Sequence, residues 1–203
     1  MPGAPMRSVD VVALGGGHGL SATLRALRRV TPHLTAVVGV SDDGGSSGRL
    51  REEFGIVPPG DLRMALAALC GDDTWGSTWA RVLQHRFSSK GELDGHSLGN
   101  LLITALWEET DDLVEGLDWV ARLLDAKGKV LPLCIEPLEI YAEVLTSAGQ
   151  TQQVRGQVQV ATTPHIIQSI GLAPKNPAVC EQAVAAVRHA DFVVLGPGSW
   201  YTS

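Results

Sequence analysis

The 203-residue sequence has no apolar run long enough to cross a bilayer, and its first ten residues, MPGAPMRSVD, lack the apolar core of a signal peptide. It has no excess of basic residues either: the formal net charge of −6 excludes a general nucleic-acid-binding surface. Linkers, repeats and low-complexity tracts are also missing. These absences predict a soluble, cytoplasmic protein, and a 44% hydrophobic content suffices for a single domain over residues 1–203.

Cysteine is scarce, with Cys70, Cys134 and Cys180 far apart in the chain. No CxxC pair is present, which argues against a zinc site and a disulfide framework. Each cysteine stands among apolar residues. We therefore expect three buried, unreactive thiols and no metal site.

Four short apolar runs, each ending at a turn or loop, are typical of buried strands in a parallel sheet. They cover residues 9–14, 35–40, 129–134 and 191–195. Helical periodicity predicts helices near residues 21–30, 61–70, 75–87, 96–109, 111–128 and 176–190. We expect Ser21 and Asp61 to cap two of these helices. The alternation of strands and helices predicts an α/β fold with a mainly parallel sheet and right-handed crossovers.

Two stretches depart from this alternation. Residues 139–157 alternate weakly around the turn SAGQ, and residues 165–174 form a further extended piece, so we expect a small antiparallel flap. The sequence ends with DFVVLGPGSWYTS, directly after a strand and its loop, where a βα unit continues into a helix. We therefore expect the domain to be truncated at its C-terminal end.

Glycine-rich loops follow strands or open helices at residues 15–19 (GGGHG), 41–48 (SDDGGSSG), 95–100 (GHSLGN) and 196–199 (GPGS). In an open parallel sheet, loops after the strands surround one crevice. The first loop is not GxGxxG, because Leu20 stands at its sixth position, and a plain turn explains it nearly as well as a phosphate site. Its place between a strand and a helix favours phosphate, because a helix N-terminus supplies free N–H donors and partial positive charge.

Asp42 and Asp43 follow the second strand, where dinucleotide folds place an acid that binds ribose hydroxyls. A solvated Asx turn is the alternative, and it explains one aspartate better than two. His96 and Asn100, four residues apart, either share a ligand-facing helix face or form a cap and a buried polar contact. Asp61 and Arg63 read, from the residues alone, as a helix cap and a surface arginine.

Four segments taken in order resemble the YvcK-type gluconeogenesis factors, in the larger group of CofD-like proteins that includes 2-phospho-L-lactate transferase. They are VVALGGGHGLSATLRAL, VSDDGGSSGRLREEFGIVPPGDLR, GHSLGNLLITAL and LGPGSWYTS, and the resemblance runs from Val9 to the last residue. Two positions depart from the family pattern: His18 stands where threonine is common, and Met64 where asparagine is common. The wording of the second loop favours the YvcK branch over the transferases.

The resemblance implies a Rossmann-like three-layer α/β/α fold and a nucleotide or nucleotide-sugar ligand, with UDP-N-acetylglucosamine the leading candidate. It implies a role in cell shape and cell-wall maintenance during growth on gluconeogenic carbon sources. We also expect association with copies of the same chain. The motif positions of the resemblance are the ligand-binding candidates: Gly15, Gly16, Gly17, His18, Gly19, Asp42, Asp43, Gly44, Gly45, Ser46, Asp61, Arg63, His96, Asn100, Gly196, Gly198 and Ser199.

Three hypotheses follow from the motifs and the resemblance. The first is a nucleotide-sugar-binding regulatory protein, in which Asp42 and Asp43 accept bonds from sugar hydroxyls and residues 44–47 donate to phosphate. The second is a Mg²⁺-dependent phosphoryl- or nucleotidyl-type transferase, in which Asp42 or Asp43 orients the attacking hydroxyl or holds the metal. The third is an NAD-binding protein. Because no matched acid–base pair is evident in the sequence, we favour the first, without a catalytic activity.

Overall fold

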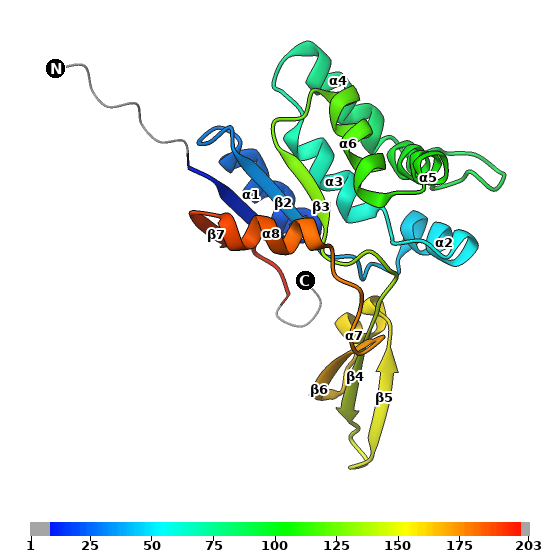
Figure 1. The fold of residues 1–203 in the computed structure, drawn as a ribbon. Coiled ribbons are helices and arrows are strands. Elements are labelled where there is room, and N and C mark those ends of the chain that lie inside the picture. Colours follow the sequence, from blue (N-terminus) through cyan, green and yellow to red (C-terminus); the bar gives the residue numbers. More distant parts are fainter. Residues whose placement is uncertain (1–8, 200–203) are drawn as a thin grey trace.

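The structure, a computed structural model, describes residues 9–199 and contains the predicted parallel sheet. Its four strands are β1 (Val11–Gly15), β2 (Leu34–Val38), β3 (Lys129–Pro132) and β7 (Phe192–Leu195), in the order β3-β2-β1-β7. Every neighbouring pair is parallel, so all four carboxyl ends lie on one edge. Figure 1 shows this sheet at the centre of the molecule.

One face of the sheet packs against α1 (Gly17–Leu27) and α3 (Gly60–Leu69), and this side contains most of the apolar core. Ala13 and Ala36 of the strands lie in the same buried cluster as Leu24 and Leu66 of the two helices. Next to them lie α4 (Thr74–Gln84), α5 (Leu98–Thr110) and α6 (Leu113–Leu124), of which α6 also packs against β3 (Figure 1). These helices had been expected from the apolar periodicity, with bounds that differ by a few residues.

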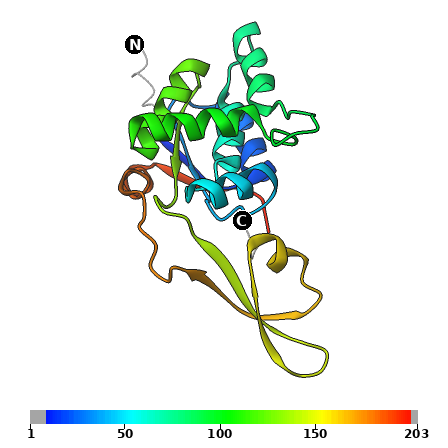
Figure 2. The same cartoon turned by 90° about the vertical axis from the view of Figure 1, so that its right-hand side faces the viewer.

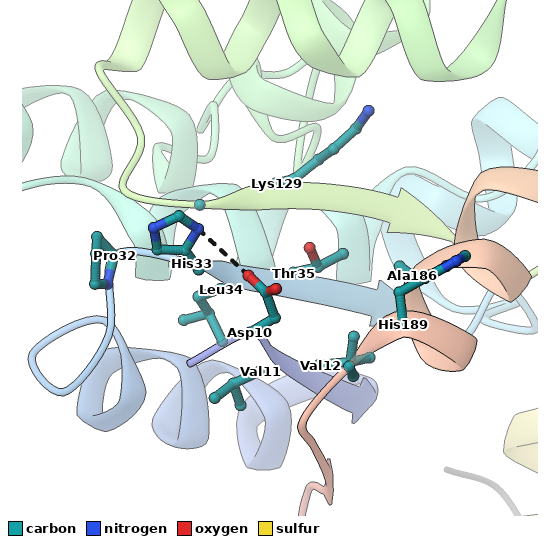
Figure 3. A pocket seen from close by; sticks show the side chains of 12 residues that line it. Asp10, Val11, Val12, Pro32, His33, Leu34, Thr35, Lys129, Ala186 and His189 are labelled. Carbon is teal, nitrogen blue, oxygen red and sulfur yellow. Dashed lines mark ion pairs between the residues drawn. The ribbon is translucent and has the colours of Figure 1, made fainter. Parts of the chain in front are cut away.

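The opposite face packs against α8 (Glu181–His189), whose Ala183 shares a buried cluster with Val12 and Val37. Helices therefore cover both faces, and the three-layer α/β/α fold is confirmed. A hollow of about 380 Å³ lies between α8 and the amino ends of β1 and β2 (Figure 3). An ion pair of 3.3 Å between Asp10 and His33 crosses its rim.

The predicted antiparallel flap is also present. It contains β4 (Glu139–Leu145), β5 (Thr151–Arg155) and β6 (Ile166–Ala173) in the order β5-β4-β6. The flap projects away from the helical layers (Figures 1 and 2) and has its own small cluster of buried apolar side chains. The short helix α7 (Gln157–Thr162) inserts Val160 into this cluster, and no helix was expected there.

Four local expectations were wrong, and one of them concerns Arg63, which was expected at the surface but is only 4% exposed. Helix α2 (Gly45–Phe54) was not expected, because it starts with glycines and serines and buries a single large apolar residue, Leu50. Helix α1 begins four residues before Ser21, which is therefore buried inside the helix and caps nothing. Asp61 does not cap α3: it is the second residue of that helix, and its carboxylate lies against the first glycine loop.

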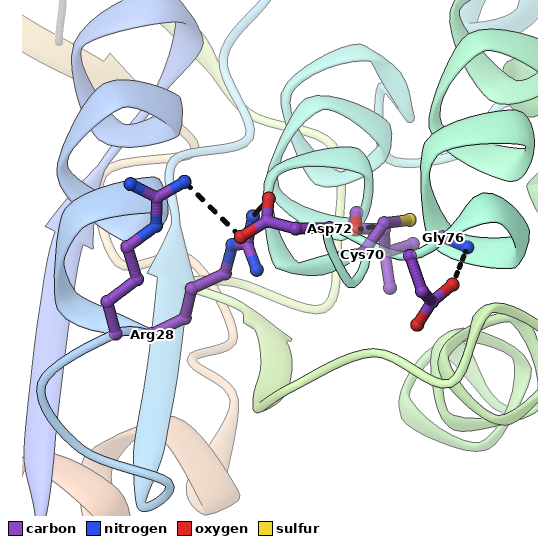
Figure 4. A network of polar contacts seen from close by, with 7 residues as sticks. Arg28, Cys70, Asp72 and Gly76 are labelled. Carbon is purple, nitrogen blue, oxygen red and sulfur yellow. Dashed lines mark hydrogen bonds and ion pairs between the residues drawn. The ribbon is translucent and has the colours of Figure 1, made fainter.

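Ion pairs also connect the end of α1 with the end of α3. Asp72, after α3, bonds to Arg28 and Arg29 at the end of α1, and hydrogen bonding from Arg28 lowers the pKa of Asp72 (Figure 4). The next residue, Asp73, caps α4 by accepting a 2.7 Å bond from the Gly76 N–H. Nearby Cys70 is buried, as are the other two cysteines, and none forms a disulfide, as expected. Within residues 9–199, no helix has the length and apolarity to cross a membrane.

Candidate functional site

The first and last glycine loops meet at the carboxyl edge of the sheet. The Gly196 N–H donates to the Leu14 carbonyl at 2.8 Å, which joins the end of β7 to the end of β1. Any Cβ at Gly19 would collide with the Pro197 carbonyl, so only glycine allows the two loops to approach this closely. Gly17 has φ +55°, in the left-handed region that glycine favours.

A pocket of about 390 Å³ lies where these loops meet. Seven of the seventeen predicted site residues line it: Gly16, Gly17, His18, Gly19, Asp42, Asp61 and Gly198. The loops after β1, β2 and β7 thus lie at one edge of the sheet, as the sequence predicted. The N–H groups of residues 17–19 belong to the first turn of α1, where no acceptor exists within the helix.

Asp61 is the most perturbed acid of the pocket. Desolvation and the nearby charge of Asp42 raise its pKa to about 6, although a hydrogen bond from the Gly17 backbone and the charge of Arg63 oppose the rise. One carboxylate therefore already occupies part of the helix N-terminus, the position where an anion is favoured. It changes its charge close to neutral pH.

The polar groups of the second glycine loop have partners both within the loop and in the flap. Asp42 accepts a 3.0 Å bond from the Gly44 N–H, as in an Asx turn, and its carboxylate also lines the pocket. Asp43 instead accepts a 3.2 Å bond from the Val158 N–H at the start of α7. The two neighbouring acids thus have different roles, because one faces the pocket and the other joins the loop to the flap.

Ser46 lies behind this loop, in a buried polar network. Its Oγ accepts bonds from the Ser97 N–H at 3.2 Å and the Asn100 side-chain amide at 3.1 Å, and lies 3.1 Å from His96 Nδ1. A hydroxyl has one donor and two acceptor positions, so Ser46 is fully used if it donates to a neutral His96. Burial lowers the pKa of His96, which favours that neutral ring. The network ends at Arg63, whose Nε donates to Asn100 Oδ1 at 2.8 Å.

The remaining predicted residues lie outside the pocket lining. Gly15 and Gly196 are packed against each other at the strand ends, and Gly44 donates its N–H to Asp42. Gly45 is exposed at the start of α2, and Ser199 is exposed at the end of the described segment.

Three residues that line the pocket were not predicted: Met64 on α3, Gln157 on the flap and Pro197 in the last loop. Met64 had been noted only as a departure from the family pattern. Pro197 lies inside the GPGS motif, whose glycines alone were chosen. Gln157 follows Gly156, whose φ of +95° turns the chain into α7, and a lone glycine in a flap is too weak a signal to place it.

No group of three or more potential metal ligands occurs among residues 9–199. The hollow beside α8 lies at the amino ends of β1 and β2, opposite the glycine loops (Figure 3). Ligands of open α/β sheets bind at the carboxyl ends of the strands, so the glycine pocket is the candidate functional site.

Known proteins share both the sequence pattern and the fold described above. Residues 11–203 match the family described as 2-phospho-L-lactate transferase CofD. The chain belongs to the CofD family. A solved structure of a UPF0052 member from Bacillus halodurans superimposes with a TM-score of 0.88 at 39% identity, covering 98% of this chain and 61% of that one.

Named relatives of this CofD-family chain are gluconeogenesis factors, which confirms the YvcK-type resemblance. The Listeria innocua protein of that name is 39% identical over 95% of the chain and 58% of the relative. A Mycobacterium tuberculosis protein, provisionally named a gluconeogenesis factor, is 55% identical over 95% of the chain and 57% of the relative. The chain thus spans somewhat more than half the length of these relatives.

Proposed function

We propose that this CofD-family chain forms the nucleotide-sugar-binding part of a cytoplasmic regulatory protein, with UDP-N-acetylglucosamine as its ligand. The regulated process would be maintenance of cell shape and cell wall during gluconeogenic growth. One observation carries the binding proposal: a single pocket combines the N-terminus of α1 with two carboxylates, Asp42 and Asp61.

The two kinds of group suit different parts of one ligand. Backbone N–H groups of the first turn of α1 suit the diphosphate, because they are free donors at the positive end of the helix dipole. Carboxylates repel phosphate but accept strong hydrogen bonds from sugar hydroxyls. A nucleotide sugar presents both phosphate and hydroxyl groups, whereas inorganic phosphate presents only the part that the acids repel. Gln157, from the flap, adds a side-chain amide at the same pocket.

The experiment is calorimetric titration of the full-length protein with UDP-N-acetylglucosamine and with UDP, before and after Gly17→Asn. Asparagine tolerates the left-handed backbone of Gly17. A Cβ there would lie 3.9 Å from Asp61 Oδ1, so the side chain fits but extends into the ligand space. We expect at least a tenfold loss of affinity, about 1.4 kcal/mol.

Gly55→Asn is the matched control, since Gly55 has φ +66°, open space around its Cβ position and no place in the pocket. It should bind like the wild type. Equal affinity in all three proteins would reject the glycine pocket as the site, and no binding by the wild type would reject the ligand.

A Mg²⁺-dependent transferase is the second candidate, and the pair of Asp42 and Asp61 favours it. A carboxyl with a pKa near 6 is suited to take a proton from an attacking hydroxyl. Asp43 is engaged with the flap, so Asp61 is the better base in this mechanism. The test is chromatography of the nucleotide pool after incubating full-length protein with UDP-N-acetylglucosamine, Mg²⁺ and phospholactate-type acceptors. Protein-dependent release of UDP or UMP, lost in Asp61→Asn, would support the transferase over the sensor.

A further inference from the structure

A second pocket, of about 480 Å³, lies beside the glycine pocket, and the side chains of His18 and Met64 line both. Arg25 and Ser21 reach it from α1, Arg63 from α3, and Gln84 and Arg86 from the end of α4 and the residues after it. We call this the arginine pocket. Three arginines line it, and none of its lining residues is acidic.

The arginines are poorly neutralised by the protein. Arg63 is 4% exposed and uses Nε to bond Asn100, while its two terminal nitrogens have no hydrogen-bond or ion-pair partner within residues 9–199. Arg25 has none in the same range. Arg86 donates once, to the Gly95 carbonyl at 2.9 Å.

A buried cation without a nearby counter-charge is costly. Desolvation, and then repulsion from Arg86, lower the pKa of Arg63 to about 10, even though Asp61 and Asp42 act on it from the adjoining pocket. The two acids offset part of the charge of Arg63 from the glycine pocket, and the arginine pocket itself has no acidic lining residue.

We propose that the arginine pocket binds a small dianion of the phosphomonoester class, in a site separate from the glycine pocket. Guanidinium groups match phosphate oxygens with paired N–H donors, and three of them suit a doubly charged group. Ser21 and Gln84 supply a hydroxyl and an amide for the remaining oxygens or for the ester part. This inference does not depend on the identity of the ligand in the glycine pocket.

Because His18 and Met64 line both pockets, an anion bound in the arginine pocket would also affect the glycine pocket. A dianion at the arginine pocket would change the field at the glycine pocket, only one layer of side chains away.

Inorganic phosphate and glucose 6-phosphate are the probes, titrated into full-length protein against chloride at constant ionic strength and followed by the melting temperature. The test variant is Arg25→Gln/Arg86→Gln, because both side chains are exposed and their loss should not disturb folding. Arg51→Gln/Arg188→Gln removes the same charge from α2 and α8, away from the pocket, and is the control. Urea unfolding of both doubles checks the fold.

We expect both probes to raise the melting temperature of the wild type and of the control, and their affinity to fall at least tenfold in the test variant. An equal loss in the control would show general screening and overturn the proposal, as would phosphate acting no better than chloride. Gly17→Asn, which fills the glycine pocket, should leave the phosphate effect intact. If it abolishes that effect, phosphate binds at the glycine loop and the separate site is wrong. Absence of UDP-N-acetylglucosamine binding would reject the proposed function and leave this result untouched.

Discussion

The loops at residues 15–19 and 41–48 are both rich in glycine and both lead into a helix, yet the structure uses them differently. The first turns its backbone donors toward a pocket, and the acid that meets them, Asp61, comes from another helix. The second satisfies its own groups: Asp42 bonds Gly44, Asp43 bonds the flap and Ser46 anchors a buried network. Similar composition thus yields a loop whose backbone lines the pocket in one case. In the other it yields a loop that brings Asp42 to the pocket and otherwise holds neighbouring segments together.

The difference follows from where each helix begins. Helix α1 starts directly after a strand, so its first turn stays at the sheet edge and faces the pocket. Helix α2 starts several residues after β2, and the buried side chains of Ser46 and Ser47 face α5. Glycine content therefore does not separate pocket-lining loops from supporting ones, whereas the partners of the neighbouring polar groups do.

Ser46→Ala should have the largest effect on stability. It leaves the fully buried Ser97 N–H without its acceptor and removes a partner from His96 and Asn100, so unfolding free energy should fall by about 2–4 kcal/mol. The measurement is urea unfolding. Ser47→Ala is the control, since Ser47 is equally buried but has only a 3.4 Å bond to Asn100. An equal loss of unfolding free energy in the two variants would contradict the prediction that the Ser46 hydroxyl stabilises the network more than the Ser47 hydroxyl.

Asp61→Asn should stabilise the protein, in a pH-dependent way. The folded pKa of about 6 exceeds the ordinary value of 3.8, so the folded state binds the proton more tightly and wild-type stability falls as pH rises from about 4 to 6. Asparagine mimics the protonated acid and keeps an acceptor for Gly17. The variant should be more stable by about 3 kcal/mol at pH 7 and almost unchanged at pH 4. Unfolding at both pH values, with Glu108→Gln as the surface-charge control, tests this; a gain that is equal at both would contradict it.

Asp43→Asn should have the smallest effect, about 1 kcal/mol or less, and it should be local. The variant weakens a charge-assisted bond to the Val158 N–H, so α7 should open more often while the sheet stays unaffected. Amide hydrogen exchange should show roughly fivefold faster exchange at residues 157–162. Asp42→Asn, which removes a carboxylate one position away, should leave those amides unchanged. Faster exchange throughout the chain would mean that Asp43 supports more than the flap.

The sequence predicts the sheet well, because continuous apolar runs bounded by glycine are a strong local signal. It predicts the edge on which the loops gather, because parallel strands leave one choice. It misses α2, whose helical state depends on tertiary contacts of Ser46 and Leu50 rather than on propensity. From the residues alone Asp61 reads as a helix cap, whereas the family resemblance names it as a ligand-binding candidate. Only three-dimensional proximity shows that its carboxylate reaches the first loop of a different helix.

The Asp61 carboxylate occupies the part of the glycine pocket that the proposed ligand's phosphate would need. It accepts the Gly17 N–H at the N-terminus of α1, the place where a phosphate is expected to bind. Because it is tethered, its effective concentration there is fixed by the fold and does not change with dilution. A ligand phosphate bound there as proposed would have to displace this carboxylate or meet it in its protonated form. Acidification from pH 7 toward 5.5 would then tighten binding of the proposed ligand, because it neutralises Asp61.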